Sequence, residues 1–228
     1  MFNRKSVKEK GKLRFKANYW YSVITAFVFN LFFVTTASGV SSKSDEFTAS
    51  SDAAAASDAQ LIALAGIIIG VLTTIFAVSF LIKVFLLNPL KVGCNRFFLA
   101  NQDQNAVLSE MGYAFKNNYV NSAIGLLISD ILIGIGFCVF IIPGAILSYS
   151  YRMVPYILAD EPGIGAVDAL KKSRAMMKGN KWACFVYDLS YIGWFFLSLL
   201  TCGILSFFYV SPYKYNADAA LYKEIKGI

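Results

Sequence analysis

The chain has 228 residues, of which 57% are hydrophobic and only 15% are charged. Soluble domains of this size carry about 25% charged residues, so this composition excludes an ordinary soluble domain and is typical of a protein that spans a bilayer. The net charge of +7 does not indicate nucleic-acid binding, because the basic residues stand at the ends of apolar runs, where they can contact anionic lipids of the cytoplasmic leaflet.

The first element is a basic segment followed by a long apolar run. Residues 1–16 hold seven basic side chains and one acid, and the apolar run from Ala17 to Ser38 spans 22 residues. The apolar part of a secretory signal is shorter, about 7–15 residues. We therefore expect a retained first transmembrane helix. The Ser-, Ala- and Asp-rich residues 39–60 that follow are expected to form a flexible outer loop.

Six apolar segments follow one another along the chain, and the first two exceed the ~20 residues that cross a hydrocarbon core. Pro143 and Gly144 predict a tight turn between the third and fourth segments. The sixth is expected to continue through Pro212 toward Leu221, since transmembrane helices tolerate a proline kink. We predict an all-α membrane protein with about six transmembrane helices in a single domain over 1–228; four spans plus a re-entrant hairpin is the alternative. The segments are 19–38, 61–87, 121–141, 144–159, 182–200 and 203–212.

A short motif recurs where each of three hairpins begins. The sequence reads KANYW, KNNYV and KGNKW at these points, and each hairpin ends at a proline. This pattern predicts three direct-repeat helical hairpins with cytoplasmic amphipathic helices. Asparagine is a strong N-cap and Trp is typical of the membrane interface, so anchoring explains the motif better than ligand binding does. The helix-start residues are Asn18, Asn118, Asn180, Trp20 and Trp182, and the hairpins cover about 19–87, 119–159 and 181–226.

The distribution of lysine and arginine predicts the orientation. Eighteen of the 21 basic residues lie in four segments that share one side of a six-span protein: 1–18, 88–118, 155–181 and 212–228. The positive-inside rule places this side in the cytoplasm. We therefore expect a multi-pass protein of the cell membrane with both termini cytoplasmic.

The segment at about 163–178 is expected to form an interfacial helix. Lys171, Arg174 and Lys178 fall on one stripe at 100° per residue, and Lys181 follows them at the start of the next span. These four residues are candidate contacts to lipid headgroups. A basic face is usual for a helix that lies on the cytoplasmic leaflet, so simple surface anchoring is favoured over a specific headgroup clamp.

Two acids, Asp130 and Asp188, lie within predicted spans. A charged side chain at a helix centre costs on the order of 2.5–3.5 kcal/mol on insertion scales, so each acid needs a compensating partner. Arg152 and Lys83, which lie inside spans near their cytoplasmic ends, are the expected partners, together with nearby hydroxyl groups. A proton or cation relay and an interhelical ion pair that fixes packing are equally supported alternatives.

The sequence offers little that could support catalysis. It has no histidine, no CxxC pair, no Gly-rich phosphate loop and no metal-ligand spacing. We expect no enzymatic activity, no cofactor and no metal site. The four cysteines are expected to be small buried hydrophobes, although Cys138 and Cys202 could pair if both lie near the outer face.

Longer motifs carry a resemblance to a known family. The stretches PYILADEP and ALKKSRAMMKGNKWACFVYDLSYIGW, with NPLKVG, IIPG and YILAD, resemble the bacterial membrane-protein family known as domain of unknown function 975. The resemblance covers nearly the whole chain except the Ser/Ala/Asp loop. It implies a multi-span integral membrane protein, mostly of Gram-positive bacteria, without an assigned activity. A weaker likeness joins it to the membrane region of some glycerophosphodiester phosphodiesterases, whose catalytic domain is not present in this sequence.

The favoured function is a non-enzymatic plasma-membrane protein that organises or assists lipids or a membrane partner, the partner being another protein or a second copy of the chain. The alternative is a small transporter or channel in which Asp130, Asp188 and Arg152 line a polar route. A water-filled cavity that reaches these three residues would favour transport, whereas dry, paired side chains would favour a packing role.

Overall fold

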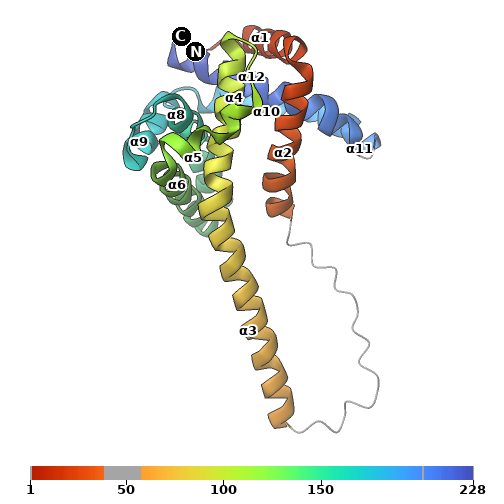
Figure 1. Ribbon diagram of the computed structural model, residues 1–228, viewed down its shortest axis with the longest axis vertical. Helices are drawn as coiled ribbons and strands as arrows, with labels where there is room; N and C mark the ends of the chain where they lie inside the picture. The colour runs from red at the N-terminus through yellow and green to blue at the C-terminus, as the bar shows by residue number, and fades with distance from the viewer. Residues whose placement is uncertain (1, 39–57, 202, 228) are drawn as a thin grey trace.

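The computed structural model describes residues 2–38, 58–201 and 203–227, and all secondary structure within them is helical (Figure 1). Most of the expected outer loop and Cys202 lie outside the described residues, and so does any pairing of Cys202 with Cys138. The helices are α1 (Arg4–Ala17), α2 (Tyr19–Ser38), α3 (Asp58–Ile82), the π-helical turn η2 (Lys83–Leu87), α4 (Asn88–Asp103), the 3₁₀ turn η3 (Leu108–Gly112), α5 (Tyr113–Asn117), α6 (Tyr119–Val139), α7 (Ile141–Tyr151), α8 (Val154–Asp160), α9 (Ala166–Met176), α10 (Lys181–Leu189), α11 (Ile192–Leu200), the π-helical turn η4 (Ser206–Val210) and α12 (Ser211–Lys226).

Three helices in the described part of the chain are long and apolar enough to cross a membrane: Ala65–Asp103, Tyr119–Val139 and Lys181–Leu200. α3 projects away from the other helices, and its side chains from Ala65 to Ile82 are exposed (Figure 1). The expected continuation of the last helix through Pro212 is confirmed, since α12 runs on to Lys226.

The second arm of the middle hairpin differs from the expected span over 144–159. α7 has 11 residues and ends at Tyr151, so it measures about 16 Å, roughly half of a hydrocarbon core. α8 starts at Val154 after a turn at Arg152 and Met153, and its residues up to Ala159 are buried. This arm is therefore two short helices rather than one continuous helix.

The turn of the middle hairpin was expected at Pro143 and Gly144, and this is wrong. The chain reverses at Phe140, which has extended backbone (φ −161°, ψ 154°) between α6 and α7. Pro143 lies in the first turn of α7. A proline is tolerated there because backbone N–H groups in the first turn have no acceptor within the helix. Gly144 permits close packing instead, because a Cβ atom there would lie 2.5 Å from the ring of Phe137.

The three repeated asparagines lie where a short helix meets the next one, and Asn118 and Asn180 hold the N-cap positions of α6 and α10. The expected hydrogen bond from the helix end to the side chain is wrong for these two. The side chains of Asn118 and Asn180 make no capping hydrogen bond. Asn18 donates from its buried amide to Asn101 Oδ1 at 2.8 Å and to a backbone carbonyl at 2.9 Å. A buried amide needs hydrogen-bond partners, and the Nδ2 group of Asn18 finds them in Asn101 and the carbonyl of Ala106.

Two prolines of the repeated hairpin ends share an unusual local structure. Pro89 and Pro212 each follow a π-helical turn, and each lacks the N–H that would bond to the carbonyl four residues earlier. The freed carbonyl of Phe85 accepts a hydrogen bond from the Tyr119 hydroxyl at 2.8 Å. The freed carbonyl of Phe208 accepts one from the Tyr19 hydroxyl at 3.3 Å. At each proline, the freed carbonyl thus accepts a hydrogen bond from the tyrosine that follows a repeated asparagine.

The short helical segments α1, η3 and α9 each pack on another helix. α1 crosses α12 so closely that a Cβ atom on Gly11 would lie 2.5 Å from the Cα atom of Ala217. η3 crosses α4 so closely that a Cβ atom on Gly93 would lie 1.8 Å from the carbonyl oxygen of Met111. α9 packs on α8, the helix that precedes it in the chain. The first and last helices are therefore in contact, and they close the arrangement into a ring.

A buried amide network joins helices of the first half of the chain to the C-terminal helix α12. Asn101 on α4 donates to Asn216 Oδ1 on α12 at 2.7 Å, and Asn216 donates to the Ser22 hydroxyl on α2 at 3.2 Å. With the bond from Asn18 to Asn101, the network spans α2, α4 and α12. Fully satisfied buried networks of this kind fix one packing arrangement.

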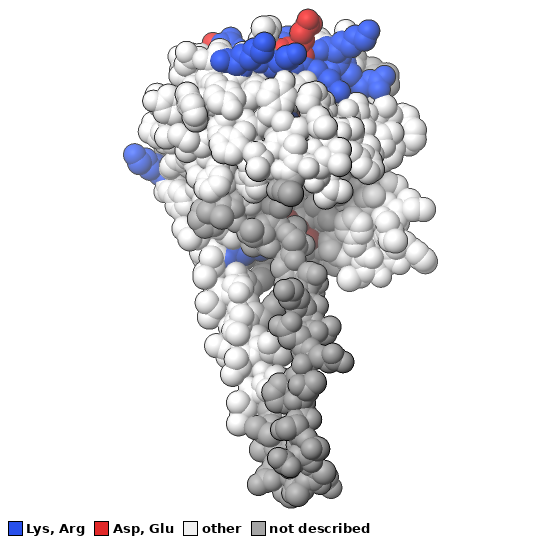
Figure 2. All heavy atoms as spheres, turned by 90° about the vertical axis from the view of Figure 1, so that its right-hand side faces the viewer, with Lys and Arg blue, Asp and Glu red and all other residues white. Residues whose placement is uncertain are grey.

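Lysine and arginine gather at the end of the molecule that carries α1, far from the tip of α3 (Figure 2). The α1 side chains Arg4, Lys5, Lys12 and Lys16 are exposed there. The molecule thus has one strongly basic end, and α3 extends away from it.

Candidate functional site

A cavity of about 600 Å³ lies between helices from distant parts of the chain. Its lining comes from α2, α4, α6, α7, α8, α10, α11 and α12. The wall combines charged groups with apolar side chains, among them Phe29, Leu126, Ile133, Phe137 and Phe195. The charged residues in the lining are Lys91, Asp130, Arg152, Asp188, Lys214 and Asp218.

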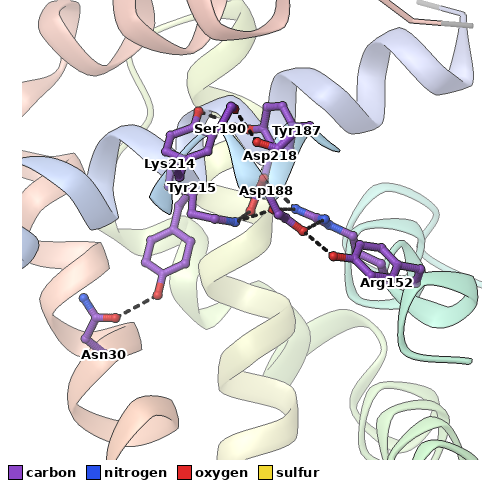
Figure 3. Close-up of polar contacts among 10 residues, drawn as sticks. Asn30, Arg152, Tyr187, Asp188, Ser190, Lys214, Tyr215 and Asp218 are labelled. Carbon is purple, nitrogen blue, oxygen red and sulfur yellow. Dashed lines mark hydrogen bonds and ion pairs between the residues drawn. The ribbon is translucent and has the colours of Figure 1, made fainter. Parts of the chain in front are cut away.

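Four of these residues form a closed cluster of ion pairs (Figure 3). Arg152 contacts Asp188 at 2.5 and 3.1 Å through its two terminal nitrogens, and it contacts Asp218 at 2.9 Å. Lys214 contacts the same two acids at 3.3 and 3.0 Å. Each carboxylate therefore touches both cations, and the cluster carries no net charge.

The helices that supply the cluster bring it together from distant parts of the chain. Arg152 directly follows α7, Asp188 is on α10, and Lys214 and Asp218 are one turn apart on α12. The side chains of Arg152, Lys214 and Asp218 are 15, 20 and 11% exposed, and that of Asp188 is 28% exposed. The Tyr149 hydroxyl also donates to Asp188 at 3.2 Å. Partly buried charges need such multiple partners to offset their desolvation.

The second predicted acid is also paired. Asp130 contacts Lys83 at 2.9 Å, and both side chains are more than a third exposed. Asp130 lines the cavity whereas Lys83 does not. The structure therefore brings Asp130, Arg152 and Asp188 to one cavity and places Lys83 behind Asp130.

Three charged residues of the cavity were missed from the sequence: Lys91, Lys214 and Asp218. The two lysines each stand two residues after a repeated proline, in NPLK and SPYK, and they were counted only as cytoplasmic cations. Asp218 is four residues after Lys214, so the two share a helix face. That spacing, with the repetition of lysine after proline, is the signal that could have identified them.

The candidate headgroup residues lie away from the cavity. Lys171 and Arg174 are exposed on α9, Lys178 is exposed in the turn after it, and Lys181 is partly buried at the start of α10. α9 begins at Ala166, slightly later than expected, and Gly179 follows it with φ +84°. Trp20 and Trp182 are 70 and 71% exposed, as interfacial anchors would be.

A second group of ion pairs fastens the C-terminal helix at the basic end of the molecule. Lys226 contacts Asp160 at 2.5 Å and Glu161 at 3.1 Å, and Lys172 contacts Glu161 as well. Burial acts to raise the pKa of Asp160, but hydrogen bonds from Lys226 and Tyr222 outweigh it and hold the pKa below its usual value. The hydrogen bond from Lys172 lowers the pKa of Glu161. Burial acts to lower the pKa of Lys226, but its bonds to the two carboxylates raise the pKa overall.

As far as the structure describes the chain, the lining of the cavity combines charged and apolar side chains and offers no metal-binding group. Within the described residues, no three His, Cys, Asp or Glu side chains are grouped so as to hold a metal ion. Three basic and three acidic side chains line the cavity, so a bound molecule can meet both signs of charge there. The apolar part of the same wall suits a hydrocarbon portion.

One family model matches the chain, over residues 103–228, and its description is "Protein of unknown function (DUF975)". The match begins at the end of α4 and includes all later helices, whereas the sequence motifs had indicated a likeness over nearly the whole chain. No curated protein matches, and no solved structure matches.

Proposed function

The chain belongs to the DUF975 family, and from the cavity it contains we propose a function for it: a non-enzymatic, multi-pass protein of the bacterial plasma membrane that binds the polar head of an amphipathic molecule, such as a lipid of the surrounding leaflet. The observation that carries the proposal is the cavity of about 600 Å³ with charged and apolar walls. Its charged part is built by Arg152, Asp188, Lys214 and Asp218.

The mixed lining is what favours an amphipathic ligand. A small ion would gain nothing from Phe137, Phe195 and the other apolar side chains in the same wall. A purely apolar molecule would displace water from the charged cluster and offer its partly exposed charges no polar contact in return. An amphipathic molecule matches both parts of the wall. A zwitterionic or uncharged polar head would leave the net charge of the cluster unchanged.

We further propose that the three hairpins are direct repeats that surround this cavity. Supporting this are the matched bonds of Tyr19 and Tyr119 to the carbonyls freed by Pro212 and Pro89. The packing of α1 on α12, of η3 on α4 and of α9 on α8 follows the same order. Repeated membrane units often meet around a central binding site. This proposal includes six membrane crossings. In that count, the short helices α7 and α8 together make one crossing, and α10 and α11 together make another.

The experiment that tests the proposal compares what the protein retains from its membrane. The chain is extracted into nanodiscs without detergent exchange and studied by native mass spectrometry. Ala145→Trp fills the cavity from its wall, and Val120→Trp adds the same bulk at an exposed position of α6. We expect a bound amphipathic molecule in the native chain and in Val120→Trp, and its loss in Ala145→Trp. Equal retention by all three would refute the proposal.

The proposed orientation places both termini in the cytoplasm. It is supported by the gathering of lysine and arginine at the end that carries α1 (Figure 2). A cysteine in place of Ser51, in a chain whose natural cysteines are serine, reports on the loop between α2 and α3. Labelling of intact cells by an impermeant maleimide is expected. Labelling only after permeabilisation would contradict the orientation.

A small transporter or channel is the second candidate. The observation in its favour is that Asp130, Arg152 and Asp188 all line the same cavity. Asp130→Asn would then slow proton or cation flux in proteoliposomes while leaving folding intact. A flux no greater than that of empty liposomes for the native chain would remove this candidate.

A further inference from the structure

A small groove lies between α6 and α9, and Tyr151 lines both this groove and the central cavity. Its volume is about 210 Å³. The floor is apolar, with Ile128 and Leu132 from α6 and Val167 and Leu170 from α9. Val167 is 54% exposed, so part of this apolar floor is open at the surface.

Two cations line the same groove beside this apolar floor. Lys171 and Arg174 are three residues apart on α9, so their side chains share a face, and both are exposed. Lys171 has a loose contact of 3.6 Å to the exposed Asp168, and an exposed pair of this kind contributes little. In the described part of the chain, Arg174 forms no ion pair. Both cations are therefore available to an anion in the groove.

The occupant must satisfy both the apolar floor and the two cations. A soluble anion such as phosphate would contact the cations and leave the floor exposed. An apolar chain alone would cover the floor and leave the cations unmatched. An anionic phospholipid supplies both groups, and α6 is one of the helices long enough to stand among lipids.

We propose that the groove between α6 and α9 binds one anionic phospholipid of the cytoplasmic leaflet. The lipid phosphate lies between Lys171 and Arg174, and the upper part of an acyl chain covers Ile128 and Leu132. This inference rests on the membrane placement proposed above but not on any ligand of the central cavity, because none of these four residues lines that cavity.

The test measures lipid retention by native mass spectrometry in detergent. Phosphatidylglycerol and phosphatidylcholine with identical acyl chains are added separately to the native chain and to the double variant Lys171→Gln/Arg174→Gln. We expect one phosphatidylglycerol to be retained by the native chain. We expect roughly 30-fold weaker retention by the double variant, from the loss of two contacts between a basic residue and an anionic lipid. The matched control is Lys12→Gln/Lys16→Gln, which removes two exposed cations of α1 and is expected to change nothing.

A further variant tests the apolar half of the site. Leu132→Trp fills the groove and leaves both cations in place, so it is expected to lose phosphatidylglycerol, with circular dichroism showing that the helices persist. Three results would overturn the inference: equal retention of the two lipids by the native chain, unchanged retention by the double variant, or an equal loss in the α1 control. The central cavity is tested by Ala145→Trp, so failure of one site is distinguishable from failure of the other.

Discussion

Replacing Asp188 by asparagine tests whether the charged cluster is held together by its balance of charge. The change keeps the size of the side chain and removes its charge, so Arg152 and Lys214 are left with only Asp218. The contacts affected are those from Asp188 to Arg152 at 2.5 and 3.1 Å and to Lys214 at 3.3 Å. Breaking a buried ion pair from one side costs about 3–5 kcal/mol. Because 28% of the Asp188 side chain is exposed, we expect the lower end, about 3 kcal/mol.

A second substitution separates charge balance from simple loss of a contact. Asp188→Asn combined with Lys214→Met leaves one cation and one anion, Arg152 and Asp218, which are in contact at 2.9 Å. The double variant should therefore lose less free energy of unfolding than the two single variants lose together, and the difference should be about 1–3 kcal/mol.

The assay is unfolding of the purified protein by SDS titration in mixed micelles, followed by tryptophan fluorescence. The control, Lys171→Gln, changes an exposed cation outside the cluster and should alter the free energy of unfolding by less than about 0.5 kcal/mol. Additive losses in the double variant would refute the reasoning, because they would show that the four charges do not act as a unit.

Three further predictions concern packing, a kink and pH. Gly11→Ala should destabilise the fold by about 1–3 kcal/mol, because α1 has no room for a Cβ atom, whereas Gly193→Ala, at an open position, should be neutral in the same SDS titration. Tyr119→Phe should cost about 1 kcal/mol and should speed amide hydrogen exchange in the adjoining π-helical turn, since a freed carbonyl loses its donor. Lys226→Met should cost up to about 1 kcal/mol at pH 7 by thermal unfolding. The lowered folded pKa of Asp160 means that its stabilisation is present above the unfolded value near 3.8 and is lost as pH falls. The raised pKa of Lys226 means that its stabilisation is lost only above pH 10.5. Plots of stability against pH for the native chain and for Lys226→Met should therefore converge in acid and again in strong base.

The sequence predicted the features that depend on local pattern. Long apolar runs predicted helices, the repeated asparagines marked the places where one helix ends and the next begins, and Gly179 marked the end of the interfacial helix. The depth of Asp130 and Asp188 within apolar segments indicated that both acids need partners, and the structure pairs them with Lys83 and Arg152. These inferences need only helix periodicity and the cost of charge in an apolar setting.

The rest depends on contacts between distant segments. The Nδ2 group of Asn18 donates to Asn101 in a tertiary network, and nothing within KANYW indicates that network. Pro143 and Gly144 form a turn signal, yet Gly144 serves the close approach of α7 to α6. Lys214 and Asp218 lie in a segment that local composition marks as cytoplasmic, and only the packing of α12 against the other hairpins brings them to the cavity.

The most direct test of the account is an experimental density map of the protein in nanodiscs made from the membrane in which it was expressed. The account predicts density in the central cavity for a polar head beside Arg152 and Lys214, continuous with a chain that passes Phe137 and Phe195. A cavity that holds only water, or that is closed by its own side chains, would contradict the claim that this protein binds an amphipathic molecule.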